Sequence, residues 1–170
     1  MAVTAPIDIE IARSFLKADG DDDDLITIQI DSARTMCEDY CNRKFYDTAQ
    51  DQSDDFTQAL ADRTAALTAR TAALAGVDIT TDSGQATSML IRDHYLIVLT
   101  DISQRVHGVV IDPAINAAIL ITLGHLYVNR EDNVSTGNNV VQVPVGAQRI
   151  LQPKLWIGDL ADGYIDDCGS

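Results

Sequence analysis

The chain has 170 residues, 46% of them apolar, which is enough for one domain with a substantial hydrophobic core. Its 26 acidic and 12 basic residues give a formal net charge of −14, which argues against a surface that grips nucleic-acid phosphates. Three cysteines and no signal-peptide pattern argue against a secreted disulfide framework and favour synthesis in reducing cytosol. No apolar run reaches the roughly 20 residues that a membrane span requires, so we expect no membrane insertion.

The N-terminal third predicts two helices joined by a short loop. Apolar spacing predicts a helix over about 6–16 that stops at a polar stretch. The acidic run from Asp21 to Asp24 suits the start of a second helix, because acidic side chains satisfy its free amide groups and favour the positive end of its dipole. The residues that follow predict one stripe on a helix that reaches about Cys41, and they are Ile26, Ile30, Ala33, Cys37 and Tyr40.

The middle of the chain predicts an exposed connection followed by one amphipathic helix. Residues 47–58 are polar and are typical of a connection. A seven-residue repeat, RTAALTA followed by RTAALAG, predicts a helix over about 54–75 that ends at Gly76. Leucines recur on one face of this helix at positions 60, 67 and 74.

The rest of the chain predicts short strands and then a long helix. β-branched segments predict two or three strands, with candidates at 89–91, 95–99 and 106–111. Asp112 and Pro113 form a typical helix start, and the apolar run from Ile115 to Val128 predicts a helix that is apolar on more than one face. Such a helix is expected at the centre of a monomer or between subunits.

The C-terminal segment predicts a loop, a short strand and one further helix. The loop is expected over 129–139 and the strand over 140–144. The helix is expected over 146–152, where Pro153 stops it. Residues 157–170 are expected to form a flexible acidic tail.

These elements predict a mainly α fold with a small β element. A helix-loop-helix and the long central C-terminal helix would form the bundle core, with a short β-hairpin or strand insertion. We expect one domain over 1–170, in which residues 46–111 are an insertion with an amphipathic helix and short strands.

Motifs for chemistry are incomplete. Asp19, Asp21 and Asp23 alternate like the first ligands of a calcium loop, but that loop's glycine and terminal glutamate are missing. Cys37 and Cys41 are one helical turn apart without a second Cys/His pair for zinc. The chain has no nucleophile elbow and no glycine-rich phosphate loop. We therefore expect no catalytic, cofactor-binding or metal site and no enzymatic activity.

Two blocks of the sequence resemble the head-tail connector (adaptor, or head completion) proteins of tailed phages. The first is IARSFLKADGDDDDLITIQIDSARTMCEDYCNRKF at 11–45, which is similar to that family's opening helix, Asp/Gly loop and second helix. The second is DPAINAAILITLGHLYVNRED at 112–132 followed by VPVGAQRILQPKLW at 143–156, which is similar to its long helix and its proline-containing close.

The resemblance implies a structural virion protein, made in the host cytoplasm, that docks as a ring on the portal vertex and links the capsid to the tail. It implies a homo-oligomer of about twelve subunits that follows the portal's symmetry, with two different complementary patches on each subunit. The portal and a stopper or tail completion protein would be its partners. DNA would pass through the channel without specific binding, and no cofactor would be needed.

Three sets of residues are candidates for these contacts. For a subunit interface they are Ile115, Ile119, Leu123, Tyr127, Arg130 and Glu131. For docking on the portal or another partner they are Trp156, Tyr164 and Ile165. For a channel lining or a solvated acidic patch they are Asp21, Asp22, Asp23 and Asp24.

Each set has a plainer interpretation. The long helix equally suits the monomer core, Arg130 and Glu131 suit a solvated helix end, and Trp156 can pack on its own domain. The net acidity also fits an acidic DNA mimic that inhibits a nucleic-acid-binding enzyme. A small hydrolase that uses Cys37 or a pair of carboxylates is a third hypothesis.

Overall fold

The computed structural model describes residues 7–19, 22–128 and 142–157. This part of the chain is mainly helical and contains a two-stranded sheet, so the expected fold class is confirmed. The chain divides into two compact units. The first comprises Met1–Ala49 and Val109–Trp156, and the second comprises Gln50–Gly108 and Ile157–Ser170. A single domain over the whole chain stays a prediction.

The first unit opens with the expected helix-loop-helix, formed by α1 (Ile9–Leu16) and α2 (Asp23–Cys41). Asp8 caps α1, because its carboxylate accepts a hydrogen bond of 2.9 Å from the Ile11 amide. Lys17 and Asn42 follow the two helices with φ of 53°, a left-handed conformation that ends a helix and turns the chain away.

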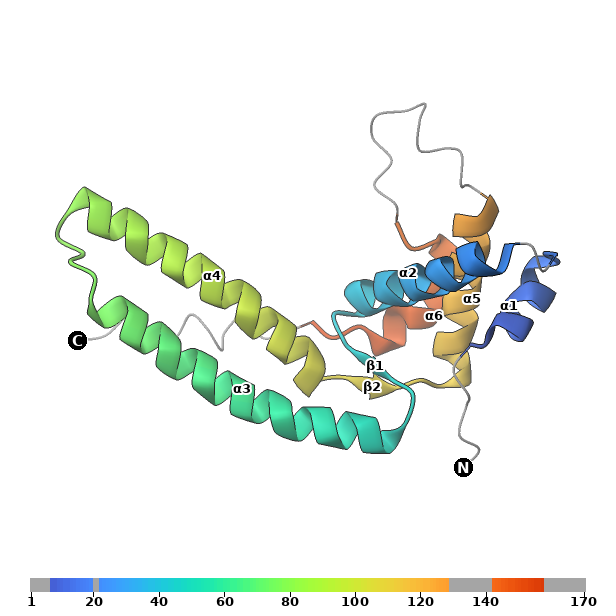
Figure 1. Cartoon of the computed structure of the whole chain (residues 1–170), viewed down its shortest axis with the longest axis horizontal. Coiled ribbons are helices and arrows are strands. Elements are labelled where there is room, and N and C mark those ends of the chain that lie inside the picture. The colour runs from blue at the N-terminus through green and yellow to red at the C-terminus, as the bar shows by residue number, and fades with distance from the viewer. Residues whose placement is uncertain (1–6, 20–21, 129–141, 158–170) are drawn as a thin grey trace. The chain divides into compact units, whose positions relative to one another are not determined.

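The long helix α5 (Pro113–Val128) forms the centre of the first unit (Figure 1). It packs against α2, against α1 and against α6 (Val145–Leu151), which a 3₁₀ turn, η3 (Gln152–Lys154), follows. The helices expected over 115–128 and 146–152 are confirmed. The largest fully buried side chains are Phe45, Ile26, Ile115, Leu123, Leu151, Thr122, Cys37 and Cys41.

The stripe predicted on α2 is confirmed. Ile26, Ala33 and Cys37 are fully buried, while Ile30 and Tyr40 are partly buried against the same core. Residues three and four apart lie on one face of a helix, so this stripe meets the apolar surface of α5.

The sheet of the first unit is small and parallel. β1 (Phe45–Tyr46) pairs with β2 (Val109–Val110), in the register Phe45 to Val109 and Tyr46 to Val110. β2 lies within the candidate strand 106–111. Because the paired strands are parallel, they require a crossover connection, and the intervening chain supplies it as helices rather than as the expected β-hairpin.

Two of the other candidate strands are wrong. Residues 89–91 and 95–99 belong to α4 (Asp82–Val106). Residues 91, 95, 98, 102 and 106 of this helix are half-buried or buried at spacings of 4, 3, 4 and 4, so helical periodicity outweighs the β propensity of its isoleucines and valines. Residues 142–144 form no strand, and the rest of the candidate strand 140–144 lies outside the described residues.

The second unit contains an antiparallel helical hairpin formed by α3 (Ala49–Ala75) and α4 (Figure 1). The connection expected over 47–58 is wrong, because α3 already begins at Ala49. Polar residues here support an exposed helix through side-chain hydrogen bonds four residues apart, from Gln50 to Asp54 and from Gln58 to Asp62, both of 2.8 Å. A largely polar segment is therefore helical.

The hairpin has a thin core. Within its described residues, the buried hydrophobic cluster consists of Ala59, Ala66 and Ile102, with Tyr95, Val98, Leu99 and Val106 packed partly against it. Arg105 joins the two helices by donating hydrogen bonds of 2.6 Å to Asp55 and 2.8 Å to Asp62. This ion pair raises the pKa of Arg105 and lowers the pKa of Asp62.

Gly84, in the first turn of α4, is expected to be a sensitive position of the hairpin. Thr81 caps α4 and accepts a hydrogen bond of 3.0 Å from the Gly84 amide. A Cβ at Gly84 would lie 1.8 Å from the Asp78 carbonyl oxygen, so the backbone must shift. We expect Gly84→Ala to lower the free energy of unfolding by about 1–3 kcal/mol, measured by urea denaturation of the full chain.

Gly76 is the matched control, directly after the end of α3, where the connection to α4 begins. A Cβ there meets nothing within 4 Å. Gly76→Ala is expected to leave stability unchanged or to raise it by about 0.4–1 kcal/mol, because alanine restricts the unfolded chain. Equal destabilisation by the two substitutions would contradict the packing described for Gly84.

Candidate assembly surfaces

Two residues of the acidic run at the start of α2 form side-chain hydrogen bonds with other helices of the first unit. The Arg13 side chain of α1 donates two hydrogen bonds to the Asp23 carboxylate, one of them 2.6 Å from Nε, and this contact lowers the pKa of Asp23. The Tyr127 hydroxyl of α5 donates to Asp22 at 2.6 Å. Asp24 is exposed, and Asp21 lies outside the described residues. A role for this run in lining a channel stays a prediction.

The candidate interface residues of α5 lie at different depths. Ile115 and Leu123 are fully buried in the core of the first unit and Ile119 is nearly so, which agrees with the plainer interpretation of a monomer core. Tyr127 is half-buried beside Asp22, while Arg130 and Glu131 lie outside the described residues. A subunit interface along this helix stays a prediction.

The candidate docking residue Trp156 is attached to the first unit. It is half-buried, and its backbone amide donates a hydrogen bond of 3.0 Å to the Cys41 carbonyl at the end of α2. Tyr164 and Ile165 lie outside the described residues.

Asp112 links the start of α5 to the segment that follows α6. Its carboxylate accepts a hydrogen bond of 2.5 Å from Lys154 and caps α5 by accepting a hydrogen bond of 2.9 Å from the Ile115 amide. Burial raises the pKa of Asp112, but these hydrogen bonds outweigh it and lower that pKa.

A buried carboxylate near the end of α2 was not predicted from the sequence. The Glu38 side chain, 9% exposed, accepts hydrogen bonds of 2.9 Å from the Phe45 amide and 3.2 Å from the Lys44 ammonium. Arg34, one turn earlier, donates a hydrogen bond of 2.6 Å to the Phe45 carbonyl and one of 3.0 Å to the Asp47 carboxylate. The network fixes β1 against α2. The spacing of Arg34 and Glu38 was the one signal visible in the sequence.

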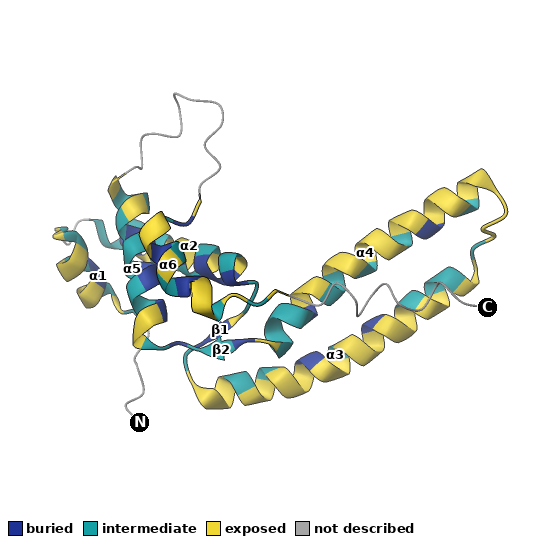
Figure 2. Ribbon diagram, turned by 180° about the vertical axis from the view of Figure 1, so that it is seen from behind, coloured by how far each residue is buried: buried dark blue, intermediate teal, exposed yellow. Residues whose placement is uncertain are grey.

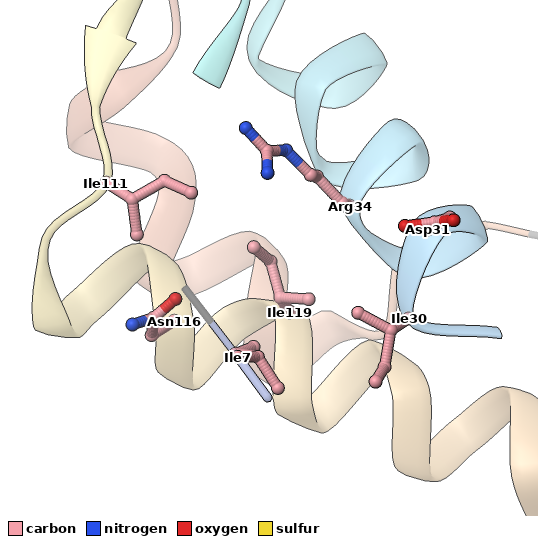
Figure 3. Close-up of a pocket in the computed structure, with 7 residues that line it drawn as sticks. All are labelled: Ile7, Ile30, Asp31, Arg34, Ile111, Asn116 and Ile119. Carbon is pink, nitrogen blue, oxygen red and sulfur yellow. The ribbon is translucent and has the colours of Figure 1, made fainter. Parts of the chain in front are cut away.

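A cavity of about 170 Å³ lies between α2 and α5 in the first unit (Figure 3). Its lining consists of Ile7, Ile30, Asp31, Arg34, Ile111, Asn116 and Ile119. Four isoleucines dominate this lining, and Arg34 is already held by Phe45 and Asp47. The cavity therefore presents no pairing of a nucleophile with a base.

The thiols of α2 are free and buried. Cys37 and Cys41 lie in the core, and Cys37 Sγ is 3.6 Å from the Thr122 hydroxyl. Burial raises the pKa of both thiols to about 11.

In the described part of the chain, no group of three or more His, Cys, Asp or Glu residues could hold a metal ion. The same residues contain no helix long and apolar enough to cross a membrane.

The raised pKa values predict slow thiol chemistry in the folded chain. In a Cys168→Ser background, we expect Cys37 and Cys41 to react with Ellman's reagent at pH 8 at least about 100-fold more slowly than in urea, since their thiolate population falls by about two powers of ten. Because the folded pKa exceeds the ordinary value of 9.0, their contribution to stability is present below pH 9 and is lost as the pH rises through 11. Rapid labelling of the native chain would contradict this burial.

Two exposed apolar surfaces lie on the hairpin of the second unit, whose helices are largely exposed (Figure 2). The first, the α3 stripe, consists of Phe56, Leu60 and Leu67, which are 40–42% exposed. The second, the α4 patch, consists of Met89, Leu90, Leu96 and Ile97, which are 60–72% exposed. The sequence repeat indicated part of the α3 stripe. The α4 patch was not predicted, because residues 89–91 and 95–99 were expected to form strands rather than one helical face.

Each of the two units is thus built mainly from helices that are held by apolar packing and ion pairs within the unit. Residues 7–90, about half of the chain, match the family model described as Phage gp6-like head-tail connector protein. Over these residues the chain belongs to that family, so the family recognised in the sequence is confirmed. The first block of the resemblance, at 11–45, lies within the match, whereas the second, at 112–132 and 143–156, lies outside it and stays a prediction. The family is structural and non-enzymatic, which sets aside the hydrolase hypothesis. No significant match was found among curated proteins or among solved structures.

Proposed function

We propose that the chain is an adaptor that assembles as a ring on the portal at the capsid vertex, extends the DNA channel and links the capsid to the tail. The observation that carries this proposal is the family match over residues 7–90. That match favours the adaptor role over the acidic DNA mimic. In this role the chain is made in the host cytoplasm and ends in the virion between capsid and tail.

The charge of the chain supports a channel through which DNA slides. A net charge of −14 on each subunit repels DNA phosphates wherever acidic side chains face the channel, so DNA passes without adhering. A closed ring uses heterologous contacts, which require two different complementary patches on each subunit. The ring is expected to follow the portal's symmetry and to present its other side to a stopper or tail completion protein.

The first test is the assembly state of the purified full chain, alone and mixed with portal rings from the same phage. Negative-stain imaging and mass from light scattering report both samples. A ring in either sample, or portal rings that gain the mass of bound subunits, is the expected result. A chain that stays monomeric and ignores the portal would overturn the proposal.

A further inference from the structure

The α3 stripe and the α4 patch carry opposite charges at their centres. Arg63 lies seven residues after Phe56, three after Leu60 and four before Leu67, so it stands inside the α3 stripe. Arg70 follows one heptad later on the same side. The charge that accompanies the apolar side chains of α3 is therefore positive.

The α4 patch has the complementary arrangement. Asp93 lies four residues after Met89, three after Leu90, three before Leu96 and four before Ile97, so an exposed carboxylate stands among four exposed apolar side chains. Asp82 and Asp101 lie on the flanks of this outward face. The patch is apolar with a negative centre, and Arg92 borders it beside Met89 and Leu96. It faces away from the buried side of α4, which contains Ile102.

We propose that the α3 stripe of one copy of this chain docks on the α4 patch of a second copy, so that the hairpins join neighbouring subunits head to tail. The inference rests on the proposed ring. Docking would place Arg63 of one copy against Asp93 of the next and would remove both apolar surfaces from water. Stripe against stripe would oppose arginine to arginine, and patch against patch would oppose aspartate to aspartate, so the charges disfavour a two-fold contact.

The thin core of the hairpin supports the same conclusion. Helices of 27 and 25 residues bury a described hydrophobic cluster of only Ala59, Ala66 and Ile102. Most helical stability comes from packing of an apolar face, and here the seven large apolar side chains of the α3 stripe and the α4 patch lie outside the hairpin's own core. A neighbour's hairpin supplies the missing packing. Contacts between two different patches are heterologous, the type that closes a ring.

The test combines apolar and charge substitutions in the full chain, with self-association measured by sedimentation velocity and subunit loading measured on portal rings. Leu90→Asp and Ile97→Asp are each expected to weaken self-association, or loading of successive subunits, by at least about tenfold. Ile79→Asp is the matched control, since Ile79 is 63% exposed in the turn but belongs to neither surface. Far-UV circular dichroism checks that every variant keeps its helices.

A charge exchange tests the pairing directly. Arg63→Glu and Asp93→Arg are each expected to weaken association, because each places like charges in contact. Mixing the two variant chains, or combining both substitutions in one chain, is expected to restore association, since each junction regains opposite charges.

The possible results separate this inference from the proposed function. Wild-type assembly that the α3 and α4 variants leave unchanged would overturn the inference and leave the adaptor role intact. Variants that lose portal binding while their self-association is unchanged would assign the patches to the portal and would also overturn it. A wild-type chain that neither self-associates nor binds portal rings would overturn the proposed function and this inference together.

Discussion

Replacing Leu123 with alanine is expected to lower the free energy of unfolding by about 2–5 kcal/mol. Leu123 is fully buried on α5, in the cluster where this helix meets α2 and α6. Truncation removes apolar contacts and leaves a cavity that the surrounding helices refill only in part. Urea denaturation followed by far-UV circular dichroism measures the loss.

The protein concentration at which Leu123→Ala is measured distinguishes the two interpretations of α5. A core residue costs the same stability at all protein concentrations, whereas an interface residue costs more where subunits are assembled. Val128→Ala on the same helix is the control, because Val128 is 77% exposed and its truncation is expected to change stability by less than about 0.5 kcal/mol. A Leu123→Ala chain that unfolds like the wild type but assembles poorly would assign Leu123 to the interface.

The helices of the first unit were predictable because their signals are local. Asp112 and Pro113 mark the start of α5, and the stripe on α2 follows from its spacing alone. The residues that pack against an apolar helix are distant in the sequence. The run from Ile115 to Val128 therefore predicted that this helix is buried, but not whether the same chain or a neighbouring subunit buries it.

The hairpin was predicted less well because two sequence signals pointed elsewhere. The polar composition over 47–58 is typical of a loop, but side-chain hydrogen bonds between residues four apart stabilise the first turns of α3. The isoleucine, leucine and valine residues over 89–99 are typical of strands, but the half-buried residues among them follow a helical period. The turn between the two helices carries no strong glycine or proline signal at its centre.

The acidic run shows why candidate surfaces require the fold. Four consecutive aspartates read as one solvated patch, yet Asp22 and Asp23 accept hydrogen bonds from Tyr127 and Arg13. The partner of Asp22 lies 105 residues away in the chain, so no local pattern could have indicated the contact. The run therefore both starts α2 and ties it to α1 and α5.

Glu38 fixes the strand through which the chain leaves the first unit. Glu38→Ala is expected to lower the free energy of unfolding by about 2–3 kcal/mol. The substitution removes the acceptor of the buried Phe45 amide and the carboxylate that faces Arg34 and Lys44. A buried donor without an acceptor costs more than the original hydrogen bond contributed, whereas Arg34 keeps its contacts with Phe45 and Asp47 and the half-exposed Lys44 is solvated by water.

Asp47→Ala is the control within the same network. Asp47 binds the same Arg34 at 3.0 Å, but its side chain is 39% exposed, so water replaces the lost contact and the expected change is about 0–1 kcal/mol. Glu38→Gln is expected to fall between the two, because it keeps an acceptor for the Phe45 amide and loses the charge. Equal losses for Glu38→Ala and Asp47→Ala in urea denaturation would mean that β1 is held by apolar packing of Phe45 rather than by the buried carboxylate.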